Sequence, residues 1–280
     1  MQRKSAFVAL VTAGVLPIVF TTTAFAASAP PLQHVLHNTN YAPYQQESLV
    51  ENETIKYLGQ SIQLATKSVF HVEMRNHQLV EYGTVTEKAQ GSTQQVHVFI
   101  QSGVEYVNTG TGWKVVGKLA SNALDSLTSA QDSALTVTHT ARTKAGFQYT
   151  AKINPSQLAP ALQSLLGMLS ATGTNTKVQA STVAELLKDG SGSTTINTRL
   201  INKYWRISVQ SSVMNIPVSA AVLSKLTGVA VPPSSSSVTK KVYGTGGTKP
   251  QPAMTILVHE HLALAYAKKP VTAPKGLPKK

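Results

Sequence analysis

Apolar and polar residues alternate in several separate segments, and this period of two limits the fold more than any other feature. In residues 147–153 (FQYTAKI), Phe147, Tyr149 and Ala151 fall on one side and the polar residues between them on the other. Comparable runs, rich in β-branched and aromatic residues, occupy residues 68–87, 94–103, 194–213 and 254–266. Such runs predict antiparallel strands of a sheet with one face covered and the other in solvent.

Helical spacing predicts a long helix near the start of the fold. From Asn52 onward, Ile55, Leu58, Ile62 and Ala65 recur at intervals of three or four residues, which is typical of an amphipathic helix. The strands and a later set of helices follow it. This order predicts an α+β domain with a large antiparallel sheet and helices on one side.

Two further helices are predicted after residue 153. Asn154 is a suitable N-cap, Pro155 suits the first helical position, and an apolar helix then extends to about Ser170. A shorter helix begins at Thr182 and ends at Gly190.

The first 26 residues have the organisation of a secretory signal peptide. Arg3 and Lys4 precede an apolar stretch, and Ala24-Phe25-Ala26 is a small-x-small cleavage signature. We therefore expect a secreted, extracytoplasmic protein. Retention of this segment as an anchor is the alternative, although its apolar run is short for a span of about 20 residues.

The remaining chain is divided by its prolines and lysines. Residues 27–50 contain three prolines among polar residues and are predicted to be a flexible arm. Residues 51–267 are expected to form the folded domain, and residues 268–280 a basic, proline-rich tail.

Composition limits both the chemistry and the partners. The chain has no cysteine, which excludes disulfides, thiolate nucleophiles and thiolate metal ligands. Lys and Arg number 25 against 12 Asp and Glu, giving a net charge of +13. This excess favours anionic cell-wall polymers as partners. Because the lysines are scattered outside the tail, nucleic acid is not expected. Few carboxylates must be protonated in acid, so we expect stability at low pH.

No catalytic or metal-binding motif stands out. His259 and His261 fall on the same face of a predicted strand, but Glu260 faces the other way and no third ligand has suitable spacing. The sequence has no G-x-S-x-G elbow, no H-E-x-x-H and no glycine-rich phosphate loop. We expect no catalytic residues, no metal and no cofactor. An enzyme whose site is assembled from distant residues is the less favoured alternative.

The segment 103–117 (GVEYVNTGTGWKVVG) predicts a hairpin. Its Asn and glycines suit a tight turn, and Tyr106 and Trp113 lie on either side of it. We interpret the two aromatic residues as stabilising the sheet and not as contacting a ligand.

The order of these segments resembles the lipoprotein-carrier superfamily of bacterial exported proteins, the LolA and LppX/LprG type. The resemblance rests on residues 53–68, 96–116, 146–166 and 203–212, and on the proline-marked end of the chain. It implies a half-barrel, a curved antiparallel sheet with helices packed in its concave face. It also implies a non-enzymatic protein that holds lipid or acyl chains. Unlike the lipoproteins of this group, the chain lacks an acceptor cysteine.

The expected ligand-binding residues are apolar side chains of the two longer predicted helices. They are Leu158, Leu162, Leu165, Leu166, Leu169, Ile55, Leu58 and Ile62. These residues line an acyl-chain cavity in this interpretation, or they fill an ordinary core. A cell-envelope scaffold or sensor that binds anionic wall polymers through its basic charge is the alternative function.

Overall fold

The computed structural model of this 280-residue chain describes residues 29–57, 60–75, 78–89, 91–118, 133–159, 180–227 and 252–278. Their strands are β1 (Tyr44–Tyr57), β2 (Gln60–Arg75), β3 (Gln78–Ala89), β4 (Ser92–Gln101), β5 (Val104–Asn108), β6 (Trp113–Lys118), β7 (Leu135–Arg142), β8 (Phe147–Ile153), β9 (Ser191–Ile201), β10 (Tyr204–Val218) and β11 (Met254–Ala265). Their helices are α2 (Leu32–Asn40), η1 (Pro155–Leu158), α5 (Ala180–Leu187) and α6 (Ala220–Thr227). The predicted signal peptide, residues 1–26, lies outside the described residues.

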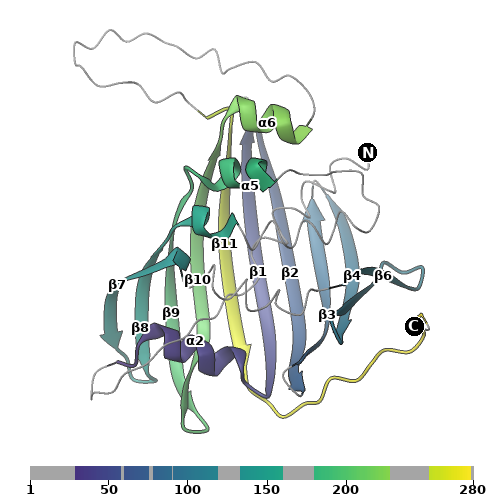
Figure 1. Cartoon of the computed structure of the whole chain (residues 1–280), viewed down its shortest axis with the longest axis vertical. Coiled ribbons are helices and arrows are strands. Elements are labelled where there is room, and N and C mark those ends of the chain that lie inside the picture. The colour runs from purple at the N-terminus through teal and green to yellow at the C-terminus, as the bar shows by residue number, and fades with distance from the viewer. Residues whose placement is uncertain are drawn as a thin grey trace.

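All eleven strands belong to one antiparallel sheet, in the order β6-β5-β4-β3-β2-β1-β11-β10-β9-β8-β7 (Figure 1). The first and last strands, β1 and β11, lie side by side at its centre and pair along twelve residues from Gln46↔Ala265 to Tyr57↔Met254. Strands that are consecutive in the sequence make all the remaining pairs, and α6 lies between β10 and β11 in the chain. The predicted fold class, an α+β half-barrel with a large curved antiparallel sheet, is confirmed.

The helices pack against one face of the sheet, which we call the inner face. At one end of the strands, α5 and α6 cover Ile55, Met214 and Ile256 with apolar side chains that include Val183 and Leu223 (Figure 1). At the other end, α2 lies across the inner face near β10. Because side chains alternate along a strand, the register assigns every strand residue to the inner or the outer face.

The segment predicted to be a flexible arm is an integral part of the fold. Leu32, Val35, Leu36 and Thr39 of α2 are buried at helical spacing, and the first three pack on Ile207. β1 then begins at residue 44. The prediction was wrong because it relied on the prolines and polar residues of 27–50 and overlooked the apolar residues on one side of α2.

Thr39 connects α2 to an irregularity in the sheet. Its hydroxyl donates to the Val35 carbonyl oxygen over 2.8 Å and accepts from the Ile207 amide over 2.9 Å. The pairing of β9 with β10 shifts register between Ile207 and Val209. The Thr39 hydroxyl therefore satisfies a buried amide in β10 next to this shift.

The long helix predicted from Asn52 is also wrong, since residues 52–57 belong to β1 and residues 60–65 to β2. The register pairs Glu53 with Leu64 and Ile55 with Ile62, so these side chains share the inner face. Buried positions of β1 include two glutamates, Glu51 and Glu53. A strand that buries carboxyl groups does not show the alternation of apolar and polar residues that identifies an ordinary half-buried strand. The few apolar residues that remain in β1 and β2 happen to have helical spacing, and this spacing led to the wrong prediction.

The outer face carries an aromatic cluster that the C-terminal tail covers. Phe99 and Tyr106 are buried there, with Trp113 partly buried beside them. Val271 and Leu277 of the tail pack on this cluster. The predicted hairpin is confirmed as β5 and β6, and the Asn108 side chain accepts hydrogen bonds from two amides of its turn.

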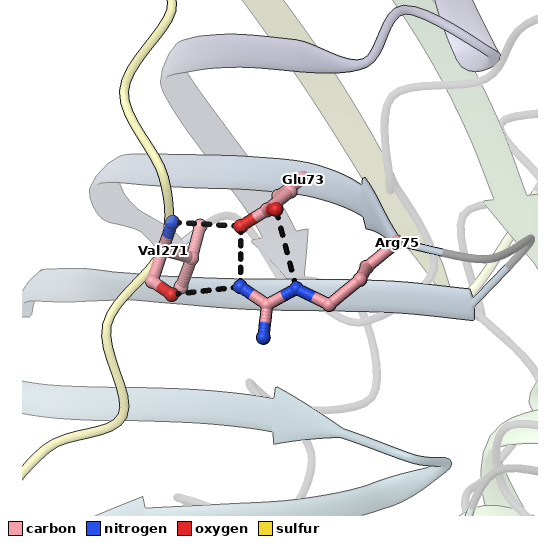
Figure 2. A network of polar contacts seen from close by, with 3 residues as sticks. All are labelled: Glu73, Arg75 and Val271. Carbon is pink, nitrogen blue, oxygen red and sulfur yellow. Dashed lines mark hydrogen bonds and ion pairs between the residues drawn. The ribbon is translucent and has the colours of Figure 1, made fainter.

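Two charged residues of β2 hold the tail in place (Figure 2). The Val271 amide donates to Glu73 over 2.9 Å, and Arg75 donates to the Val271 carbonyl oxygen over 3.3 Å. Arg75 also forms an ion pair with Glu73 at 2.7 Å. The tail predicted to be a separate basic segment is thus docked on the sheet as far as residue 278.

Candidate ligand-binding site

A continuous row of polar side chains crosses the inner face at the middle of the strands. Register places Thr194, Ser212, Glu260, Glu51, Thr66, Glu87 and Gln94 directly beside one another on β9, β10, β11, β1, β2, β3 and β4. On the α5–α6 side, the next positions include Met214, Val258 and Leu64, all in the apolar core. The row is therefore a polar boundary beside an apolar region.

Four glutamates in and beside this row form the central carboxyl cluster: Glu51, Glu53, Glu87 and Glu260. Glu51 and Glu260 face each other across β1 and β11, and Glu53 lies two residues further along β1. Glu51, Glu53 and Glu260 are only 1%, 2% and 7% exposed. Their side chains are consequently almost fully removed from water.

Five oxygen atoms of this cluster have no donor in the described part of the chain. They are both carboxyl oxygens of Glu51, both of Glu53, and Oε1 of Glu260. Glu51 and Glu53 are placed so that a proton on Glu51 can be shared between them. Such buried oxygens without partners are uncommon in folded proteins, because each costs about 1–3 kcal/mol or more.

Burial gives the cluster unusual acidities. Loss of hydration raises the pKa of Glu51, and the hydrogen bond and the negative charge of Glu53 raise it further. Burial also raises the pKa of Glu53 and of Glu87, and it raises the pKa of Glu260 to about 8. These carboxyl groups therefore keep their protons to a higher pH than an exposed glutamate does.

Three more glutamates form a lateral carboxyl cluster on the same face: Glu47, Glu81 and Glu105. Glu81 and Glu105 both lie beside Ile100 of β4. Burial raises the pKa of Glu47 to about 7, and burial with the charges of Glu47 and Glu105 raises that of Glu81 to about 8. Seven of the twelve acidic residues of the chain thus face the inner side.

Basic side chains are segregated from these carboxyl groups. The region considered is the inner face of β1 to β4 and β8 to β11, from the two carboxyl clusters to α5 and α6. Within the described parts of these strands, the register places no lysine or arginine there. Lys56, Lys67, Lys88 and Lys152 of these strands are exposed on the outer face. A protein with a net charge of +13 therefore has an acidic inner face.

Hydroxyl and amide groups extend the row toward β9. The Gln210 side-chain amide donates to Ser212 over 3.2 Å, and Ser212 donates to Thr194 over 3.0 Å. Thr194 in turn donates to the Ser211 carbonyl oxygen. None of these three hydrogen bonds goes to Glu260.

The structure separates the predicted ligand-binding residues into two groups. Ile55 and Leu158 are buried in the apolar core beside the row, and Ile62 packs against it. The other five lie outside the described residues: Leu58, Leu162, Leu165, Leu166 and Leu169. The three residues that are described lie together on the α5–α6 side of the central carboxyl cluster.

The side chains of His259, Glu260 and His261 lie on the faces of the sheet that the alternation predicted. His259 and His261 are exposed on the outer face and Glu260 is buried on the inner face. Among the described residues, no three His, Asp or Glu side chains converge on a possible metal position. No helix in the described ranges is long and apolar enough to cross a membrane.

Sequence reasoning placed Glu260 on the face opposite His259 and His261, but it missed that seven glutamates share the inner face. A usable signal was present, since Glu47, Glu51 and Glu53 are separated by even intervals, as are Glu81 and Glu87. Even intervals place side chains on one face of a strand. The signal was lost for β1 because its residues were assigned to an arm and a helix.

Comparisons with known proteins give likenesses of fold only. No protein-family model and no curated protein sequence matches the chain. The structure of LprF from Mycobacterium bovis is similar at 10% identity and a TM-score of 0.35, covering 88% of this chain and 95% of that one. A DUF1329 family protein from Desulfovibrio piger is similar at 9% identity and a TM-score of 0.28, covering 83% and 89%. Values this low do not indicate what this chain binds.

Proposed function

We propose that the chain is an exported, non-enzymatic binding protein that holds a lipid or acyl chain between the sheet and its helices. The apolar part of the ligand would lie beside Ile55, Ile62 and Leu158. The predicted signal peptide accounts for export, and the absence of catalytic motifs is in keeping with a binding role.

The observation that carries this proposal is the row of partnerless carboxyl oxygens beside the apolar core. Five buried oxygens of Glu51, Glu53 and Glu260 have no donor within the described residues. Adjacent inner positions carry Met214, Val258 and Leu64. An apolar surface with a few convergent polar groups of altered pKa is typical of ligand sites. A ligand with a polar head and an apolar chain would satisfy both parts.

Native mass spectrometry of the protein purified from its own host tests this function. We expect a lipid-sized mass addition that organic extraction removes, together with a lower melting temperature after extraction. A uniform mass equal to that of the polypeptide, unchanged after incubation with lipid extract from the host, would contradict the proposal.

A pair of neighbouring substitutions on β2 provides a matched control. Thr66→Trp would place a large side chain on the inner face between Glu51 and Glu87, and we expect it to reduce the bound lipid. Lys67→Trp changes the next residue, which is exposed on the outer face, and should leave the lipid content unchanged. Circular dichroism would establish that both variants are folded.

The outer lysines favour the second candidate, association with anionic wall polymers. Lys56, Lys67, Lys88 and Lys152 are exposed on the face opposite the carboxyl clusters, so their charge is not neutralised by them at short range. Retention on isolated cell wall that falls as salt is raised would support this candidate, and loss of retention on replacing these lysines with glutamine would locate the surface.

A further inference from the structure

The central carboxyl cluster constrains the charge of the ligand. From the contacts of Glu51, Glu53 and Glu260, we infer that the polar head of the ligand carries an ammonium or guanidinium group that binds between β1 and β11. This inference rests on the proposed function, because it specifies the head of the amphiphile that the inner face would hold.

Charge balance is the first argument for a cation. Glu51 lies opposite Glu260, and Glu53 and Glu87 are near enough to add to the repulsion at Glu51. Among the described strand residues, the nearest positions on the inner face carry Thr66, Ser68 and Ser212, which are neutral. A buried carboxylate is normally paired with a positive group. The described residues place none beside the cluster, and a cationic ligand head would supply one.

The donor count is the second argument. An ammonium group has three N–H donors and a guanidinium group has five, whereas an alcohol has one. A proton shared between Glu51 and Glu53 engages two of the five oxygens. The other three still lack a donor among the described residues, which suits a multiply donating head. Hydrogen bonds from charged donors to carboxylates are about twice as strong as neutral ones.

The described residues favour an organic cation over a metal ion. No group of three His, Asp or Glu side chains among them converges on a possible metal position, whereas a calcium ion takes about six to eight oxygen ligands.

Binding of such a head would displace protons. The carboxyl groups of Glu51 and Glu260 hold protons at neutral pH in the empty protein, since burial raises the pKa of each. When an ammonium group binds, the O–H bond of a carboxyl breaks, its proton leaves to solvent, and the resulting carboxylate pairs with the cation. Binding should consequently weaken as the pH is lowered.

Three ten-carbon probes with different heads test the inference: decylamine, 1-decanol and decanoate. Their affinities for the delipidated full mature chain are measured by calorimetry at about pH 7. We expect decylamine to bind roughly ten-fold or more tightly than 1-decanol, the effect of one charge-assisted hydrogen bond. Decanoate should bind most weakly. Titration in two buffers of different ionisation heat should report about one proton released per decylamine.

Two variants separate a charge effect from a fold effect. Glu51→Gln preserves shape and should abolish the preference for decylamine over 1-decanol while retaining 1-decanol binding. Glu185→Gln, at an exposed glutamate of α5 that pairs with Lys225, should leave the preference unchanged. Retained melting transitions would establish that both variants fold.

The possible failures are distinguishable. Binding of 1-decanol or decanoate as tight as that of decylamine would overturn the inference of a cationic head and leave the proposed function intact. A preference that survives in Glu51→Gln would overturn the assignment to this cluster. Failure of all three probes to bind would contradict the proposed function and the inference together.

Discussion

Glu51 of β1 lies directly opposite Glu260 of β11, so two buried carboxyl groups face each other at the centre of the sheet. Like charges at opposed positions of neighbouring strands are destabilising. The pair is compatible with a stable sheet when at least one carboxyl is protonated or when a cation binds between them. This relationship leads to the first two predictions.

Stability of the ligand-free protein should fall as the pH rises from acid to mildly alkaline. Burial raises the pKa of Glu260 and of Glu81 from 4.5 to about 8, and that of Glu47 to about 7. Between pH 4.5 and these values the folded state binds more protons than the unfolded state, so the free energy of unfolding decreases with pH. The stabilisation is fully present below about pH 4.5 and lost through about pH 8. Urea unfolding at about pH 5 and about pH 8 measures this, and equal stability at both would contradict it.

Glu260→Gln should stabilise the ligand-free protein at about pH 9. Burial raises the pKa of Glu260 to about 8, so at that pH the change removes a buried carboxylate whose Oε1 has no donor among the described residues. We expect the free energy of unfolding to rise by about 1–3 kcal/mol. At about pH 5 the effect should be small, because the native carboxyl is then already protonated. Glu185→Gln is the control and should lower stability by no more than about 1 kcal/mol, as for other exposed ion pairs. Destabilisation by Glu260→Gln at about pH 9 would be evidence against the cluster as described.

Glu73→Ala should release the C-terminal tail. The carboxylate accepts from the Val271 amide and pairs with Arg75, and leaving a buried amide without an acceptor costs about 1–3 kcal/mol. Trypsin should then cleave after Lys268 much faster than in the native protein. Glu185→Ala should not change this rate. These bonds lower the pKa of Glu73, so their stabilisation is present above its unfolded pKa and is lost as the pH falls below it.

Thr39→Val should loosen α2 from the sheet. Valine has the shape of threonine but cannot accept the hydrogen bond from the Ile207 amide at 2.9 Å, and we expect a loss of about 1–3 kcal/mol in the free energy of unfolding. Thr39→Ser retains the hydroxyl and should lose less. Hydrogen exchange of the Ile207 amide measures the effect directly, and unchanged protection in Thr39→Val would exclude this role.

Local pattern in the sequence was sufficient for the hairpins. The turn after Asn108 and the strands 135–142 and 147–153 follow from alternation and from residues suited to tight turns. The inward position of Glu260 and the outward positions of His259 and His261 also followed from the period of two. Each of these features depends on residues close together in the chain, so local pattern specifies it.

Only the tertiary structure decided the candidate site. Pairing of β1 with β11 joins Glu51 to Glu260, which are 209 positions apart, and no local periodicity encodes such a partner. Alternation in the sequence shows which residues of a strand share a face, but it does not show which face is buried when both carry polar residues. In β1 the buried face includes Glu51 and Glu53. Their even spacing was written in the sequence, but their burial and their meeting with Glu260 arise from the sheet, which removes all three carboxyl groups from water.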